Sequence, residues 1–157
     1  MRSIQGEFDG DGLRIAIVST RWNDDIVDRL VDGALDVLND CGVDEDDITV
    51  VRVPGAFELP LAVDRLAEGD SYDGIIALGA VIRGDTPHFD FVAGECAKGL
   101  SAAALEYGVP VGFGVITADN AEQADARAQP DEDHNKGAEA ASAVVEMANL
   151  LRLISDE

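Results

Sequence analysis

The fold is decided by the stretch Asp73-Gly-Ile-Ile-Ala-Leu-Gly-Ala-Val-Ile-Arg-Gly-Asp-Thr-Pro-His-Phe-Asp90. Its first half is a continuous apolar run from Ile75 to Ile82, which is short and rich in β-branched residues. Such a run predicts a strand that is buried on both faces of a parallel sheet. The run stops abruptly at Arg83, so we expect a loop to leave the carboxyl end of this strand.

That loop is the first candidate for a ligand site, because parallel sheets bind ligands at the carboxyl ends of their strands. Gly84 allows a tight turn, and the amides of Gly84, Asp85 and Thr86 can converge on an anion such as phosphate. His88 follows, and a histidine can accept and donate protons at neutral pH. Taken alone, the tripeptide fits a plain turn that needs a glycine at positive φ better than it fits a phosphate cradle. His88 alone fits a structural role as well as a catalytic one.

Strands and helices are predicted to alternate on both sides of this stretch. The expected strands are Leu13 to Thr20, Ile48 to Val53, Ile75 to Ile82 and Pro110 to Thr117. The expected helices run from a cap at Asn23 to about Cys41, from Ala56 to Ala67, from about Asp90 to Tyr107, briefly from Asp119 or Asn120, and onward from a cap at Asn135. This order predicts an α/β fold, a three-layer α/β/α sandwich with a four-stranded parallel sheet and right-handed crossovers. Residues 13–157 form the single expected domain, and residues 1–12 an N-terminal extension that is flexible or pairs with a neighbour.

Composition excludes several classes of protein. The chain of 157 residues carries 32 acidic against 11 basic side chains, a net charge of −21, so its surface would repel nucleic acid. No apolar run approaches the ~20 residues of a membrane span. Cys41 and Cys96 lack the spacing of a metal site or a disulfide framework. We therefore expect a cytoplasmic protein with no metal, no cofactor, no nucleic acid and no membrane partner.

The acidic residues are regularly spaced on one expected helix. Aspartates recur every four residues at Asp24, Asp28, Asp32, Asp36 and Asp40. Like charges at this spacing repel in dilute salt, whereas at about 1 M salt the Debye length falls to about 3 Å. The alternative is an ordinary acidic protein with a solvated helix face. We favour adaptation to a salt-rich cytosol.

Three further side chains have both a structural and a functional interpretation, and a fourth, Phe113, has a structural one. Trp22 follows the first strand and is either a core anchor or a platform for a planar heterocycle. Glu58 lies near a helix start, where it either complements the helix or binds ligand hydroxyls. Arg127 either pairs with nearby aspartates or binds an anionic ligand. Phe113, in an apolar strand, is a core residue by default.

Three of these features follow successive expected strands. They are the residues after Thr20, the segment Pro54-Gly55-Ala56 and the segment Gly84-Asp85-Thr86. The carboxyl ends of parallel strands share one edge of the sheet, so these segments are expected to meet in one pocket.

Taken together, the motifs resemble the 6,7-dimethyl-8-ribityllumazine synthase family. They occur in family order between about residues 13 and 152: Arg21-Trp-Asn23, Gly55-Ala-Phe-Glu-Leu-Pro60, Gly79-Ala-Val-Ile-Arg-Gly-Asp-Thr-Pro-His-Phe-Asp90, Gly112-Phe-Gly-Val-Ile-Thr117, the helix from Glu122 to Arg127, Asn135-Lys-Gly137 and Glu146-Met-Ala-Asn149. The resemblance implies a flavodoxin-like fold. It also implies condensation of 5-amino-6-ribitylaminouracil with 3,4-dihydroxy-2-butanone 4-phosphate to the lumazine precursor of riboflavin, without a cofactor.

The resemblance also implies a role for each site residue. His88 is the proton donor and acceptor, and Gly84, Asp85, Thr86 and Arg127 bind the phosphate. The remaining substrate contacts are Trp22, Ala56, Phe57, Glu58, Ala80, Val81, Ile82, Phe113 and Lys136. Phe113 and Arg127 would come from an adjacent subunit of a homopentamer, and such pentamers sometimes pack into an icosahedral shell.

Two other functions stay open on the sequence. An archaeal-type riboflavin synthase shares the fold and binds the same lumazine. A non-catalytic flavodoxin-like binding or shell protein would need no pairing of His88 with Arg127.

Overall fold

A computed structural model describes residues 1–157, and its centre is a four-stranded parallel sheet. The strands are β1 (Ile15–Thr20), β2 (Ile48–Val53), β3 (Gly74–Ile82) and β4 (Val111–Ala118), in the order β2-β1-β3-β4. β3, the strand of the deciding stretch, is buried from Gly74 to Ala80. The predicted α/β fold with a four-stranded parallel sheet is confirmed.

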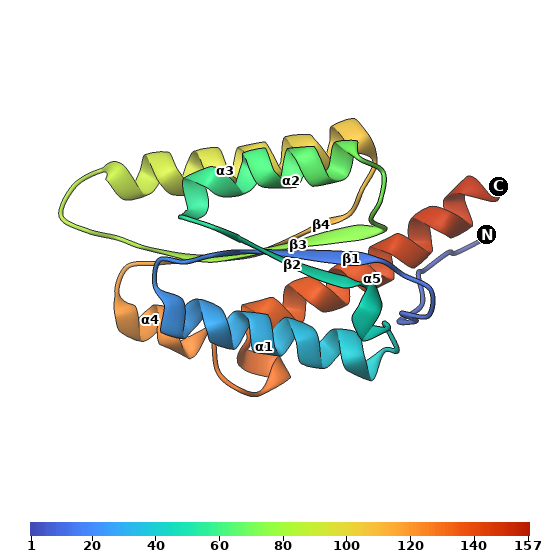
Figure 1. The fold of residues 1–157 in the computed structure, drawn as a ribbon, viewed down its shortest axis with the longest axis horizontal. Helices are drawn as coiled ribbons and strands as arrows, with labels where there is room; N and C mark the ends of the chain where they lie inside the picture. The colour runs from blue at the N-terminus through green and yellow to red at the C-terminus, as the bar shows by residue number, and fades with distance from the viewer.

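Helices cover both faces of the sheet (Figure 1). α2 (Leu59–Glu68) and α3 (His88–Tyr107) lie on one face, while α1 (Asp24–Asp40), the short α4 (Ala121–Ala126) and α5 (Lys136–Ser155) lie on the other. Each face has its own hydrophobic core, because alternate side chains of the strands point to opposite sides. Ile17, Ile76 and Leu78 pack toward α1 and α5, whereas Ala16, Val18 and Ala77 pack toward α2 and α3.

Asparagine residues stand at the starts of three helices. Asn120 and Asn135 cap α4 and α5 as predicted: their side chains accept hydrogen bonds from the backbone amides of Gln123 and Ala138. Asn23 is the N-cap residue of α1 as predicted, but its side chain makes no capping hydrogen bond. Asn23 precedes α1 in a left-handed conformation (φ 62°), and its side chain bonds elsewhere.

Two other helices begin at different residues from those predicted. The expected helix from Ala56 opens as a 3₁₀ turn, η2 (Ala56–Glu58), before α2 starts at Leu59. α3 starts at His88, two residues earlier than expected. His88 therefore belongs to the first turn of a helix and has a fixed backbone.

The first residues of the chain lie along α5. The side-chain amide of Asn149 donates to the carbonyls of Glu7 at 2.9 Å and Asp9 at 2.8 Å, and Arg2 forms an ion pair with Glu157. The two chain ends therefore lie together, at the opposite end of the molecule from the loop that follows β3 (Figure 1).

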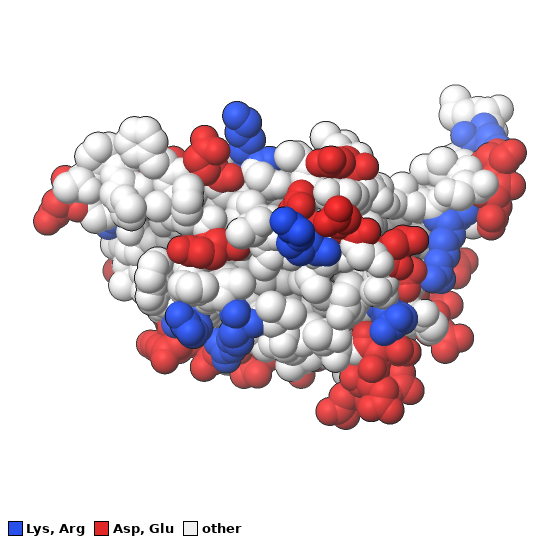
Figure 2. Space-filling model, turned by 45° about the horizontal axis from the view of Figure 1, so that its top comes forward, with Lys and Arg blue, Asp and Glu red and all other residues white.

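Charge is distributed unevenly over the surface. Figure 2 shows more acidic than basic side chains on the face that it presents, together with a broad tract that carries neither. All five aspartates of the series on α1 are exposed, and among them only Asp28 has a basic partner, Arg52, at 2.9 Å. None of the helices combines the length and the hydrophobicity needed to span a bilayer.

Candidate active site

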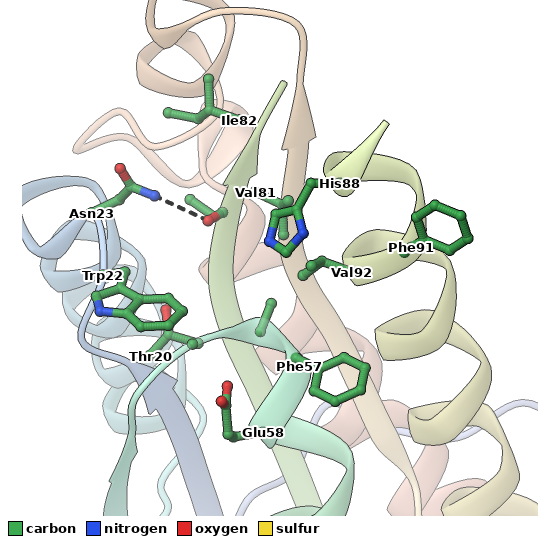
Figure 3. Close-up of a pocket in the computed structure, with 13 residues that line it drawn as sticks. Thr20, Trp22, Asn23, Phe57, Glu58, Val81, Ile82, His88, Phe91 and Val92 are labelled. Atoms are coloured by element: carbon green, nitrogen blue, oxygen red, sulfur yellow. Dashed lines mark hydrogen bonds between the residues drawn. The ribbon is translucent and has the colours of Figure 1, made fainter. Parts of the chain in front are cut away.

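A pocket of about 450 Å³ opens at the carboxyl ends of β1 and β3, where the chain also passes from β2 into η2 (Figure 3). Its lining comes from four separate segments of the chain. The lining residues are Thr20, Trp22, Asn23, Gly55, Ala56, Phe57, Glu58, Ala80, Val81, Ile82, His88, Phe91 and Val92.

The floor of the pocket is the end of β3. Ala80 is buried there, and Val81 and Ile82 are half-buried as the strand emerges from the sheet. The side-chain amide of Asn23 donates to the Ala80 carbonyl at 3.1 Å and so joins the start of α1 to this floor. A rigid, apolar strand end of this kind is a suitable floor for a flat ring.

Aromatic side chains form the two sides. Trp22 stands on one side, and Phe57 of η2 and Phe91 of α3 stand on the other (Figure 3). In the single chain these three are among the most exposed apolar side chains, at 63%, 60% and 70%. Exposed aromatic rings beside a cavity supply stacking surface for a planar ligand.

Two buried oxygen atoms in this lining have no hydrogen-bond partner, Thr20 Oγ1 and Glu58 Oε2. Figure 3 shows the Glu58 carboxylate pointing toward Trp22 and Thr20. Buried polar atoms are normally paired, because an unpaired one loses its hydration without compensation. The two atoms are therefore suited to accept hydrogen bonds from hydroxyl groups of a ligand.

His88 is the only histidine at this pocket. It lies in the first turn of α3, and its imidazole projects toward the space between Trp22 and Val92 (Figure 3). Its backbone N–H donates to Thr86 Oγ1 at 3.5 Å. An exposed imidazole at a pocket mouth is placed to exchange protons with a ligand.

The loop between β3 and α3 borders the pocket without lining it. Gly84, Asp85 and Thr86 are exposed, and a Cβ added to Gly84 would meet nothing within 4 Å. Gly84 does not have a positive φ, so the interpretation of this position as a left-handed turn is wrong. The loop's arginine, Arg83, is engaged with Asp119 at 3.0 Å and lies 4.3 Å from the ring centre of Phe89.

Three predicted site residues lie away from this pocket. Phe113 is on the edge strand β4, where it is 49% exposed. Arg127 and Lys136 line a separate, smaller hollow of about 300 Å³ together with His134. Arg127 donates to the Gln123 carbonyl at 2.8 Å, and Lys136 pairs with Glu139 at 3.0 Å. One chain therefore brings together Trp22, Ala56, Phe57, Glu58, Ala80, Val81, Ile82 and His88 only.

Five lining residues were not predicted as site residues from the sequence, and one of them, Gly55, stood in a segment that was expected at the pocket. Phe91 and Val92 lie three and four residues after His88, which is the spacing of one helix face, so that signal was present in the sequence. Thr20 and Asn23 gave no such signal, because the position of Thr20 depends on the end of β1 and that of Asn23 on a left-handed backbone.

Neither thiol belongs to the pocket. Cys96 lies on the buried face of α3, and this burial raises the pKa of its thiol to about 11. Partial burial also raises the pKa of Cys41. No group of three or more histidine, cysteine, aspartate or glutamate side chains is arranged to hold a metal ion.

Comparisons with known proteins agree with the motifs. The family model described as 6,7-dimethyl-8-ribityllumazine synthase matches residues 12–152. A protein of that name from Nitratidesulfovibrio vulgaris strain DP4 is 57% identical over 151 residues, which is 96% of each chain. Another from Desulfovibrio desulfuricans is 53% identical over the same share of both chains.

Proposed function

Because the chain belongs to the 6,7-dimethyl-8-ribityllumazine synthase family, we propose that the pocket at the carboxyl ends of β1 and β3 is its active site. The chain is a transferase of riboflavin biosynthesis that condenses 5-amino-6-ribitylaminouracil with 3,4-dihydroxy-2-butanone 4-phosphate. One observation carries the assignment of the site. Eight side chains expected from the sequence, on four segments, line the same cavity.

The aminouracil binds in the apolar part of the pocket. Trp22 stacks on the pyrimidine ring, and Ala80, Val81 and Ile82 form the floor beneath it. Glu58 accepts hydrogen bonds from ribityl hydroxyls, which its unpaired Oε2 atom supports. Ala56 and Phe57 complete the wall on the side of η2.

The phosphate of the second substrate binds at the exposed loop before α3. Gly84 and Thr86 offer backbone amides and a hydroxyl, and the carboxylate of Asp85 points away from the dianion. Arg127 supplies the positive charge, with Lys136 close to it in the same hollow. Both cations belong to the neighbouring subunit, since neither lines the pocket of its own chain.

His88 moves the protons of the reaction. The aromatic amine attacks the ketone, and the resulting carbinolamine loses water to give a Schiff base. Loss of the proton on C3 then gives an enol that expels phosphate from C4. The resulting enol tautomerises to a ketone at C3, and the ribitylamino nitrogen closes the ring on this carbonyl with loss of a second water. Each step needs a base followed by an acid, which one imidazole can supply. Holding both reactants in one cavity contributes several kcal/mol to the acceleration.

The active assembly is a homopentamer in which neighbours share each site. Large apolar side chains that are exposed in one chain support such an assembly, and they include Leu61 at 68%, Leu105 at 84% and Phe113. Cyclic symmetry presents Phe113 and Arg127 of one subunit to the pocket of the next. Sedimentation distinguishes the pentamer from an icosahedral shell of pentamers.

Incubation of the purified protein with both substrates tests the assigned activity. The product is expected to show lumazine fluorescence, and phosphate is expected to be released in equal amount. Riboflavin formed from lumazine would instead identify the archaeal-type riboflavin synthase reaction. Absence of both products would leave a flavodoxin-like binding or shell protein.

Mixed oligomers test the shared site separately. His88→Ala and Arg127→Ala subunits, each of low activity alone, are dissociated, combined and reassembled. Random mixing places an intact His88 beside an intact Arg127 in about a quarter of the sites, so activity is expected to return. No recovery from pentamers shown to be mixed would mean that both residues serve the same chain's pocket.

The proposal has three further parts. The enzyme works in the cytoplasm, which two unpaired thiols support. Its acidic surface adapts it to high salt. Residues 1–12 form an extension to the domain of residues 13–157, which agrees with a family match that begins at residue 12.

A further inference from the structure

The indole of Trp22 occupies the space where a side chain at position 55 would lie. A Cβ built on Gly55 would be 2.3 Å from both Cε3 and Cζ3 of Trp22. Ordinary contacts of a Cβ fall at 3.4–4 Å, so the ring would have to retreat by about 1 Å or more. The backbone at Gly55 is extended (φ −149°, ψ −177°), a conformation open to other residues. Glycine is therefore required here for space and not for its dihedral angles.

The turn that carries Trp22 is held on both sides and cannot move aside. The backbone amides of Arg21 and Trp22 donate to the Pro54 carbonyl at 3.2 and 3.3 Å, and that of Arg21 also to the Val53 carbonyl at 2.9 Å. On the other side, the Asn23 side chain donates to the Ala80 carbonyl at 3.1 Å. These bonds fix the backbone of Trp22 relative to both β2 and β3. A clash at position 55 would therefore be relieved by rotation of the indole itself.

We propose that Gly55 is a positioning residue, whose lack of a side chain seats the Trp22 indole and so sets the aromatic wall of the pocket. The substrate part of this inference rests on the function proposed for the pocket. Gly55 and Trp22 both line the cavity, so a ring displaced from Gly55 would change the volume proposed for the pyrimidine. Glu58 would be disturbed less, because its Oε2 atom lies 3.3 Å from the added Cβ.

The Gly55→Ala variant tests this inference, and Gly69→Ala is the matched control. A Cβ at Gly69 would have no contact closer than 3.7 Å, and Gly69 lies at the far end of α2. Trp22 is the only tryptophan, so its fluorescence, excited where tyrosine does not absorb, reports the indole alone. Gly55→Ala is expected to shift the emission of the ligand-free protein and to raise the KM for the aminouracil by about tenfold or more. The KM for the phosphate substrate and both readouts in Gly69→Ala are expected to stay close to the parent values.

A second substitution separates a seat for the indole from a general need for glycine. In Trp22→Ala neither Cε3 nor Cζ3 is present, so adding Gly55→Ala to that variant is expected to raise the KM by less than about twofold. A full tenfold effect in that background, or unchanged emission in Gly55→Ala, would overturn the proposal. If Gly55→Ala alone does not fold, folding of the double variant would support the seat, and failure of both to fold would overturn it.

Tryptophan emission and the KM for the aminouracil test different claims, so failure of this inference can be distinguished from failure of the proposed function. If the parent protein forms no lumazine, the assignment of the pocket fails. The emission of the ligand-free variants would still decide whether Gly55 seats the indole.

Discussion

At the scale of single residues, the proton transfer proposed for this pocket depends on one imidazole. His88 projects into the cavity from the first turn of α3, and the other histidine, His134, lies in a separate hollow. In the proposed function, the remaining groups around the cavity hold and orient the reactants. Proton transfer and positioning are therefore expected to respond to different substitutions.

His88→Ala is expected to lower kcat by about 10²-fold or less while the KM values change little. The limit is set by the proximity effect and the uncatalysed reaction, both of which survive the substitution. Steady-state kinetics with both substrates measures the change in kcat and in each KM. Turnover equal to that of the parent protein would remove His88 from the mechanism.

Arg127→Ala is expected to raise the KM for the phosphate substrate far more than the KM for the aminouracil. The reason is that a phosphate dianion near Asp85 needs a charge-assisted partner. Lys98→Ala is the charge-matched control, because exposed Lys98 lies on α3 outside the cavity. Equal increases for both substrates would point to an interface role for Arg127.

The ion pair of His134 and Asp131 predicts a pH dependence for the hollow beside Arg127. Their Nδ1–Oδ1 distance is 2.6 Å, and this hydrogen bond raises the pKa of His134 and lowers the pKa of Asp131. Because its pKa is raised, His134 stabilises the loop fully at pH values below the ordinary histidine pKa of 6.5. This contribution is lost as the pH rises through the pKa of His134 in the folded chain. Because its pKa is lowered, Asp131 stabilises the loop fully at pH values above the ordinary aspartate pKa of 3.8. This contribution is lost as the pH falls through the pKa of Asp131 in the folded chain.

The loop is therefore held best between about pH 4 and pH 6.5. NMR titration is expected to give His134 a midpoint above the ordinary histidine value, and Asp131→Asn should lower that midpoint. The His88→Ala variant assigns the two histidine signals. An unchanged midpoint in Asp131→Asn would contradict the ion pair.

At the scale of elements, the start of α5 depends on one buried side chain. Asn135 is 3% exposed, and its oxygen caps the helix at the amide of Ala138. Its side-chain nitrogen donates to the carbonyls of Arg29 at 3.0 Å and Gln129 at 2.8 Å. One residue thus fastens α5 to α1 and to the loop that carries His134. Close packing at this joint also requires Gly137, where an added Cβ would lie 2.0 Å from the Leu30 carbonyl oxygen.

Asn135→Ala is expected to lower the free energy of unfolding by about 2–4 kcal/mol, because it removes a cap and leaves two carbonyls unpaired. Asn120→Ala removes a cap of the same kind from exposed α4 and is expected to cost about 1 kcal/mol. Denaturant unfolding compares the two. Equal losses would mean that the bonds to Arg29 and Gln129 contribute nothing.

Some features of the helices and strands could be predicted from the local sequence, and others could not. β2 was predicted to the residue, because its apolar run ends at Pro54-Gly55. Asn23 occupies the predicted cap position, but its side chain makes no capping bond, because it donates to a carbonyl of β3, far away in the chain. The turn at Gly84 was misjudged for a similar reason, since a glycine in a sequence does not reveal its φ.

The site was predictable only where local motifs carry it. Gly55 to Glu58 and the stretch ending at His88 could be assigned, because each follows a recognisable strand. Phe113, Arg127 and Lys136 lie outside the pocket of their own chain, so their roles depend on a neighbouring subunit and stay predictions.

At the scale of the whole molecule, electrostatic repulsion opposes folding and assembly. The net charge is −21 per chain, and carboxylates crowd where the end of α1 meets the loop at Glu132. Desolvation and the adjacent carboxyl of Asp40 raise the pKa of Glu132. Such a raised pKa means that folding disfavours the ionised form of Glu132. This group therefore opposes folding as the pH rises above its ordinary pKa.

The oligomer and the activity are expected to be lost together when salt is withdrawn. Repulsion grows when several such chains associate, and screening reduces its range to about 3 Å at 1 M salt. Sedimentation and lumazine formation measured across a potassium chloride series test this. A fully active assembly at very low salt would contradict adaptation to salt, and active monomers would contradict the shared site.

The meeting of the two chain ends has a practical consequence for protein engineering. Arg2 contacts Glu157 at the end of the molecule opposite the loop before His88. A passenger domain or a fluorescent label fused to either end would therefore extend away from the pocket. A short Gly-Ser linker between the ends would close the chain into a ring, which could be reopened at the exposed turn before β2 to give a circular permutant with the same pocket.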